Sequence, residues 1–135
     1  MGYIIVFVGG GLGAALRHGI NLGVARWFGT TFPLATLFIN ISGSLIMGLI
    51  AGYFAFKGSD GSQHWRLFLT TGILGGYTTF STFSLDVALL YERGELTHAA
   101  LYIAGSVVLS IFGIFLGLAV ARSFAWSAPL PRRIS

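Results

Sequence analysis

The chain has no cysteine and few charged residues, and both shortages restrict what it can be. Without cysteine, its 135 residues cannot form a disulfide framework, a thiolate metal site or a cysteine nucleophile. Charged residues make up 9% of the chain, whereas soluble globular proteins have about 25%. Hydrophobic residues make up 55%, and the mean hydropathy is +0.83. These values predict an all-α integral membrane protein, with no nucleic-acid partner.

Four hydrophobic segments are long enough to cross a bilayer, which takes roughly 20 residues. We place the four spans at about 3–27, 33–56, 65–91 and 97–124, in a single transmembrane domain of residues 1–126. The stretch from Lys57 to Ser62 has the composition of a solvated loop. Residues 127–135 are predicted to be a disordered tail.

Basic residues flank the spans almost equally on the two sides of the membrane. Four spans place both termini on the side of Lys57, Arg66 and Arg122, together with the two arginines of the tail. Arg26 and Arg93 lie on the other side. The excess of basic residues on the side of the termini favours termini in the cytoplasm. We expect the protein to lie in the inner cell membrane. Without the tail the count is three to two, so we expect insertion in both orientations.

The third span contains an unusual stretch for a helix in lipid, Gly75-Gly76-Tyr77-Thr78-Thr79-Phe80-Ser81-Thr82-Phe83-Ser84. Adjacent glycines and β-branched threonines weaken a helix. As one straight helix this span would reach about 40 Å, longer than a hydrocarbon core of about 30 Å. We therefore predict a break near Gly75 to Thr78, where unwound carbonyls would suit a small monovalent cation.

Polar side chains in the spans form two lengthwise tracks. Tyr102, Ser106 and Ser110 recur every four residues, which places them on one face of the fourth helix. Phe80 and Phe83 share a face of the third helix beside a stripe of hydroxyls. Hydroxyl groups, a carboxamide and the electropositive edges of phenyl rings suit an anion better than a cation.

Each of these residues also has a purely structural interpretation. Phenylalanines at helical spacing commonly face the core or lipid, and serines commonly bond to the preceding turn of their own helix. Asn40 either bridges two helices or lines a pore, and we favour the pore. Arg17 either extends to the headgroups or pairs with Asp86. The sequence alone leaves these alternatives open.

Every span carries small residues at helix-packing spacing, which indicates a compact bundle. The pairs are Gly9 and Gly13, Gly19 and Gly23, Gly48 and Gly52, Gly72 and Gly76, and Gly113 and Gly117. Four helices packed in this way can hardly also enclose a polar passage. We therefore expect a homo-oligomer, most simply a two-fold dimer.

The stretch from Gly75 to Ser84 closely resembles the Gly-Gly-x-(Ser/Thr)-Thr-Phe-Ser-Thr-Phe-Ser signature of the Fluc family of fluoride channels. The likeness extends to the glycine-rich opening before Arg17, the Asn40-Ile41-Ser42-Gly43 segment and the polar fourth span. It implies an antiparallel, dual-topology homodimer with two pores that exports fluoride passively and confers fluoride resistance. It also implies that Arg17 lies near a vestibule, and that the backbone carbonyls of Gly75 and Thr78 hold a structural sodium ion. The residues it implies for the fluoride path are Asn40, Phe80, Ser81, Thr82, Phe83, Tyr102, Ser106 and Ser110.

Three other classes of function compete with this interpretation. A small multidrug-resistance-type exporter needs a carboxylate in its first span, and none is present there. A structural subunit of a larger complex would not need a polar track beside a helix break. An enzyme is not expected, because the sequence offers no carboxylate cluster, histidine pair or nucleophile elbow. Asp86 departs from the glutamate common in the Fluc family, so its role is open.

Overall fold

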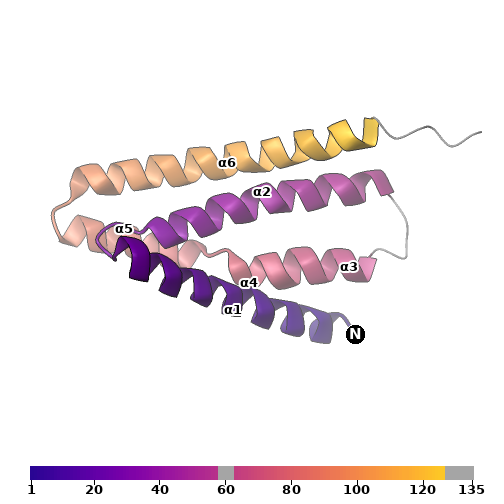
Figure 1. Cartoon of the computed structure of the whole chain (residues 1–135), viewed down its shortest axis with the longest axis horizontal. Coiled ribbons are helices and arrows are strands. Elements are labelled where there is room, and N and C mark those ends of the chain that lie inside the picture. The colour runs from indigo at the N-terminus through magenta and orange to yellow at the C-terminus, as the bar shows by residue number, and fades with distance from the viewer. Residues whose placement is uncertain (58–62, 127–135) are drawn as a thin grey trace, which may run out of the picture.

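The computed structural model describes residues 1–57 and 63–126, and the secondary structure of that part is entirely helical (Figure 1). Three helices are continuous: α1 (Gly2–Phe28), α2 (Leu34–Lys57) and α6 (Leu96–Trp126). Between α2 and α6 the chain forms α3 (Gln63–Leu67), a π-helical segment η2 (Phe68–Leu74), α4 (Gly75–Tyr77) and α5 (Phe80–Glu92). The predicted tail and, apart from Lys57, the predicted loop lie outside the described residues.

Four helical stretches are long and apolar enough to cross a membrane, as the sequence predicts. They are Gly2–Phe28, Leu34–Ala55, Gln63–Glu92 and Leu96–Phe124. In Figure 1, α1 lies along the segmented third span, while α2 and α6 run side by side in the same direction. The bundle therefore consists of two helix pairs, and the third span faces both.

Glycines bring α1 into backbone contact with the first half of the third span. A Cβ atom on Gly72 would lie 3.1 Å from Gly9 Cα, and one on Gly76 would collide with the carbonyl oxygen of Gly10. One on Gly13 would collide with the carbonyl oxygen of Ile73. Larger residues at these positions would force the two helices apart, so the predicted small-residue packing is confirmed here.

A second glycine seam joins α2 to α6. A Cβ atom on Gly48 would collide with the carbonyl oxygen of Ile114, and one on Gly117 would collide with that of Leu45. The parallel helices therefore touch at this level. The pair Gly19 and Gly23 behaves differently, because a Cβ atom on either would meet no atom within 4 Å. That pair packs against nothing within the described part of the chain.

The break in the third span is present, but its extended residues are threonines rather than glycines. Thr78 has φ −80° and ψ 158°, and Thr79 has φ −155° and ψ 120°. Gly75 remains helical, at φ −62° and ψ −38°. Propensity alone would have placed the weak point at the glycines. However, Gly76 is held in place by its close contact with α1, and the β-branched threonines take the extended conformation that suits them.

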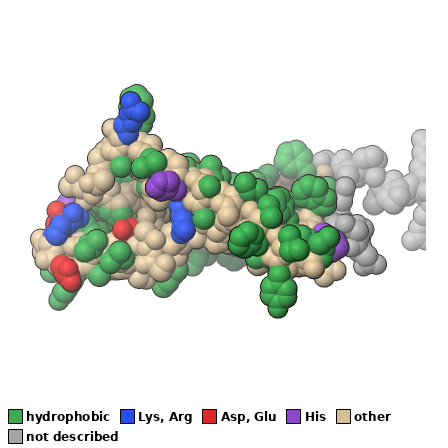
Figure 2. All heavy atoms as spheres, turned by 90° about the horizontal axis from the view of Figure 1, so that it is seen from below, with side chains coloured by type: hydrophobic (Ala, Val, Ile, Leu, Met, Phe, Trp, Pro, Cys, Tyr) green, Lys and Arg blue, Asp and Glu red, His purple; other side chains and the backbone are tan. Residues whose placement is uncertain are grey.

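Most of the apolar surface of the chain faces outward. At most 28% of the most apolar stretch of any span is buried within the chain. Figure 2 shows hydrophobic side chains spread over one face, with most charged side chains of that face near the end that carries the α5–α6 turn. Lipid or further protein must cover such a surface.

Candidate functional site

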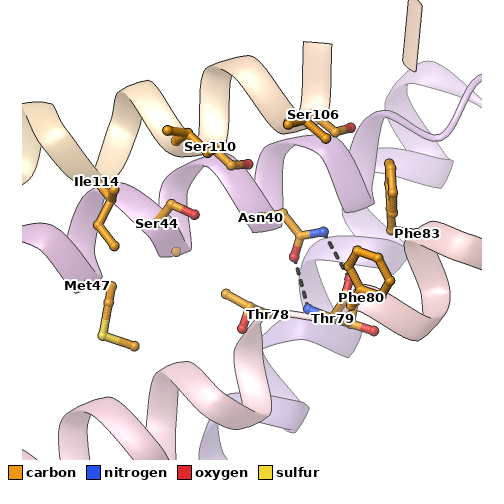
Figure 3. Close-up of a pocket in the computed structure, with 13 residues that line it drawn as sticks. Asn40, Ser44, Met47, Thr78, Thr79, Phe80, Phe83, Ser106, Ser110 and Ile114 are labelled. Atoms are coloured by element: carbon orange, nitrogen blue, oxygen red, sulfur yellow. Dashed lines mark hydrogen bonds between the residues drawn. The ribbon is translucent and has the colours of Figure 1, made fainter. Parts of the chain in front are cut away.

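The carboxamide of Asn40 on α2 bridges directly to the break in the third span. Its Nδ2 donates to the carbonyl oxygen of Thr79 at 2.9 Å, and its Oδ1 accepts from the Thr79 backbone N–H at 2.9 Å (Figure 3). Water is not available in lipid to satisfy these backbone groups. The Thr79 carbonyl oxygen, at the N-cap of α5, also accepts the first backbone bond of that helix, so the partner that the break removes and the carboxamide replaces is that of the Thr79 N–H.

The side chain of Thr79 closes the other end of the break by capping α5. Its Oγ1 accepts from the backbone N–H of Thr82 at 3.2 Å, as a residue preceding a helix commonly does. Thr79 is buried. The break is thus a fixed element of the structure, held from α2 and capped from within.

Asn40 also lines a cavity of about 410 Å³ between α2, α6 and the break, which we call the central cavity. Figure 3 shows Asn40 and Ser44 of α2 and Ser106 and Ser110 of α6 around the same space. The predicted bridge between helices is therefore confirmed, and the place of Asn40 in a pore stays a prediction that this cavity is compatible with. The described residues that line the cavity are Asn40, Gly43, Ser44, Met47, Thr78, Thr79, Phe80, Phe83, Ser106, Val107, Ser110, Ile111 and Ile114.

Ser106 and Ser110 differ from other hydroxyl residues of the spans. Thr70, Thr78 and Ser84 each donate to the carbonyl oxygen four residues earlier, at 2.7–3.0 Å. The hydroxyl oxygens of Ser106 and Ser110 are buried and have no hydrogen-bond partner within the described part of the chain. Back-bonding to the helix therefore does not account for these two serines, and both line the central cavity.

The two phenylalanines of the third span meet at one edge of the central cavity. Their ring centroids lie 5.6 Å apart. Phe83 is buried and also contacts Tyr102, at a centroid distance of 5.1 Å. Phe80 is 78% exposed in the single chain although it borders a cavity lined by polar groups. The central cavity is therefore open on the side of Phe80.

The hydroxyl of Tyr102 points away from the serines of its own helix. It donates to Asp86 Oδ2 at 2.9 Å, and the tyrosine is 1% exposed. The predicted stripe on α6 thus divides, because Ser106 and Ser110 face the central cavity while Tyr102 reaches toward α5. The alternative pairing of Asp86 with Arg17 is not formed.

Asp86 borders a second cavity of about 410 Å³, which we call the end cavity. The end cavity lies among α1, the start of α2 and α5. Thr82 lines this cavity and not the central cavity. Arg93 lines it too, and is held by Glu95 Oε2 at 3.1 Å and by the carbonyl oxygen of Thr31 at 3.0 Å. The end cavity therefore carries charges of both signs.

Four predicted site residues line neither cavity: Tyr102, Gly75, Ser81 and Arg17. Ser81 is exposed on α5, and its hydroxyl lies 3.4 Å from Thr79 Oγ1. Arg17 is half-buried on α1 and lines neither cavity, although the next residue, His18, lines the end cavity. In the single chain Ser81 and Arg17 therefore do not share a cavity with the other predicted site residues.

The break also frees backbone carbonyls at two predicted positions. In a continuous helix the N–H of Thr79 would bond to the carbonyl of Gly75, but it bonds to Asn40 instead. Likewise the N–H of Thr82 would bond to the carbonyl of Thr78, but it bonds to Thr79 Oγ1. Carbonyl oxygens released in this way are suitable ligands for a sodium ion.

Comparison with known proteins places these features in a family. The family model described as "CrcB-like protein, Camphor Resistance (CrcB)" matches residues 4–118, which include both cavities and the break. The chain belongs to this family. A relative named "Fluoride-specific ion channel FluC 2" from Nitrobacter hamburgensis is 66% identical over 122 residues, covering 90% of this chain and 98% of the relative. Another, "Fluoride-specific ion channel FluC" from Rhodopseudomonas palustris (strain BisB5), is 68% identical, covering 91% and 98%.

Several polar residues that line the cavities were not selected from the sequence, among them Ser44 and Asn21. Ser44 lines the central cavity, and it follows Asn40 by four residues, the same spacing that identified the α6 stripe. Asn21 lines the end cavity from α1. A carboxamide within a span is costly enough to have been a signal by itself.

Proposed function

We propose that this chain is the subunit of a fluoride-selective channel that exports fluoride passively across the cell membrane and so confers fluoride resistance. The observation that carries the proposal is the pair of buried, unpartnered hydroxyls of Ser106 and Ser110, facing the same cavity as the Asn40 carboxamide. Buried polar groups normally have partners. A hydrogen-bond-accepting ion passing through the cavity would be that partner, and the names of the curated relatives identify fluoride as their ion.

The chemistry of the central cavity suits an ion that must lose its hydration and then leave again. Asn40 Nδ2 has two hydrogens, and its bond to Thr79 uses one of them. The second hydrogen and the serine hydroxyls are modest donors, and phenyl ring edges add a weak positive potential. No Lys, Arg, Asp or Glu side chain is among the described lining residues, so no full charge would hold or repel the anion there.

The working unit in this proposal is an antiparallel homodimer. Phe80 is 78% exposed beside the central cavity, and the freed carbonyl of Gly75 belongs to an exposed residue. A second copy related by a two-fold axis would cover both features and complete the missing wall. Because each copy carries one central cavity, the dimer would contain two pores.

A sodium ion at the centre of this dimer would have a structural role. Its ligands would be the carbonyl oxygens of Gly75 and Thr78 from each copy, which the break frees from their helical hydrogen bonds. The ion would supply positive charge that binds two breaks together, and it would not be transported. Fluoride that enters a cell as neutral hydrogen fluoride and ionises there would leave through the pores down its gradient.

Ion efflux from liposomes that contain only the purified chain tests the proposed function. Liposomes are loaded with potassium fluoride and a low concentration of sodium salt, and valinomycin lets potassium balance the charge. We expect rapid fluoride release without a proton gradient, and negligible chloride release from matched liposomes loaded with potassium chloride.

Two results would overturn the proposal. Absence of fluoride release from liposomes that contain folded protein would exclude a fluoride channel. Release that requires an imposed proton gradient would instead indicate a coupled exporter. Liposomes without protein are the control for leakage of hydrogen fluoride, and they are kept above neutral pH to suppress it.

A further inference from the structure

The central cavity has polar groups on α2 as well as on α6. Asn40 and Ser44 are four residues apart on α2, and Ser106 and Ser110 are four residues apart on α6. All four line the same cavity, and Figure 3 shows the Ser44 and Ser110 side chains on adjacent helices beside it. Four residues of helix advance by about 6 Å.

The two helices run parallel with a fixed register, which determines how these polar groups are staggered. A Cβ atom on Gly48 would lie 3.1 Å from Gly117 Cα, and one on Gly52 would meet Ala121 Cβ. This register places Ser110 between the levels of Asn40 and Ser44. The polar groups therefore form one staggered track along the cavity, in the order Ser106, Asn40, Ser110 and Ser44.

The side chain of Ser44 is not used elsewhere within the described part of the chain. The neighbouring Ser42 lies 2.8 Å from the Tyr77 hydroxyl and donates to the Ile39 carbonyl oxygen at 3.2 Å. Ser44 has no such bonds among the described residues, and it borders the cavity. Just beyond it the contact of Gly48 with Ile114 closes the space between α2 and α6.

We propose that Ser44 and Ser110 together coordinate an anion at the end of this track, beyond Asn40 and Ser106. This inference rests on the proposed channel function. Beyond this pair, α2 and α6 touch at Gly48 and Ile114. Ser44 is thus the last donor that α2 offers before the seam.

Cysteine substitution tests this placement, because the chain has no native cysteine to react. Ser44→Cys, Ser110→Cys and Ser42→Cys are each reconstituted in chloride-free buffer and exposed to Ag⁺, a small thiol-specific ion. We expect Ag⁺ to reduce fluoride efflux at least tenfold in Ser44→Cys and Ser110→Cys, and fluoride to slow that inhibition. Ser42→Cys and the unsubstituted chain should keep their efflux.

A charge comparison provides a second measurement if a cysteine variant does not conduct before treatment. Ser44→Asp and Ser44→Asn have similar size and differ in charge, and Ser84→Asp with Ser84→Asn is the matched pair on exposed α5. We expect the aspartate to lower efflux at least tenfold relative to asparagine at position 44 only. Equal efflux of the two position-44 variants, or Ag⁺ insensitivity of Ser44→Cys, would overturn the inference. Silence of the unsubstituted chain would instead remove the proposed function.

Discussion

Asn40 combines a structural task with a position beside the proposed anion path. Its carboxamide bonds to both backbone groups of Thr79 and also borders the central cavity. The Asn40→Ala variant would leave the buried N–H of Thr79 without a partner, at a cost of about 1–3 kcal/mol, and would also remove the bond to the Thr79 carbonyl oxygen. We expect a clear fall in the free energy of unfolding, measured by titration with a denaturing detergent and helical circular dichroism.

The matched control for Asn40→Ala is Ser44→Ala, which removes a hydroxyl from the same helix face without breaking a bond to the third span. Its unfolding midpoint should stay near that of the unsubstituted chain. If Asn40→Ala were equally stable, water in the cavity would be serving Thr79, and the carboxamide would have no structural task.

At the scale of elements, the broken third span has two halves with different partners. The half before Thr78 is fastened to α1 through glycine contacts, whereas the half after Thr79 carries Phe83 and Asp86 toward α6. The threonines between them free the carbonyls of Gly75 and Thr78. The break thus separates a proposed cation site from a proposed anion path.

Removal of sodium tests the cation half of this arrangement. A ligand that binds only the folded state stabilises it by about 2.7 kcal/mol at 100 times its dissociation constant. We therefore expect purified protein in sodium-free N-methylglucamine buffer to show a lower thermal midpoint and a larger monomer fraction, both restored by sodium. Potassium is the control, since its larger radius should make it a weaker substitute. Identical midpoints in all three buffers would contradict the sodium site.

The sequence predicted the elements better than it predicted their detailed geometry. Hydropathy gave four spans, and glycine spacing gave both packing seams, because these signals are local. The extended residues are Thr78 and Thr79 because contact with α1 keeps Gly76 helical. Helix propensity depends only on the local sequence, so it could not predict the effect of a contact with another helix. Tyr102 turns away from its stripe for a similar reason, since its hydroxyl is drawn to Asp86 on another helix.

At the scale of the whole molecule, the open central cavity and the near balance of flanking charges concern the same question, the orientation of a second copy. An antiparallel dimer requires chains inserted both ways. Orientation follows the excess of Lys and Arg near the span ends. Removing Arg26 and Arg93 from one side should therefore bias insertion in one direction, and removing Arg66 and Arg122 should bias it in the other.

The expected result is loss of fluoride efflux with either double variant alone and its recovery when the two are co-expressed. Orientation is measured directly by attaching a membrane-impermeant thiol reagent to Gln63→Cys, an exposed position in a chain that has no other cysteine. The unsubstituted background should label from both sides of the membrane, and each double variant mainly from one. Arg93 also bonds to Thr31 and Glu95, so Arg26→Ala alone serves as the control for lost contacts. Full efflux from a uniformly oriented variant would show that parallel chains suffice and would refute the antiparallel dimer.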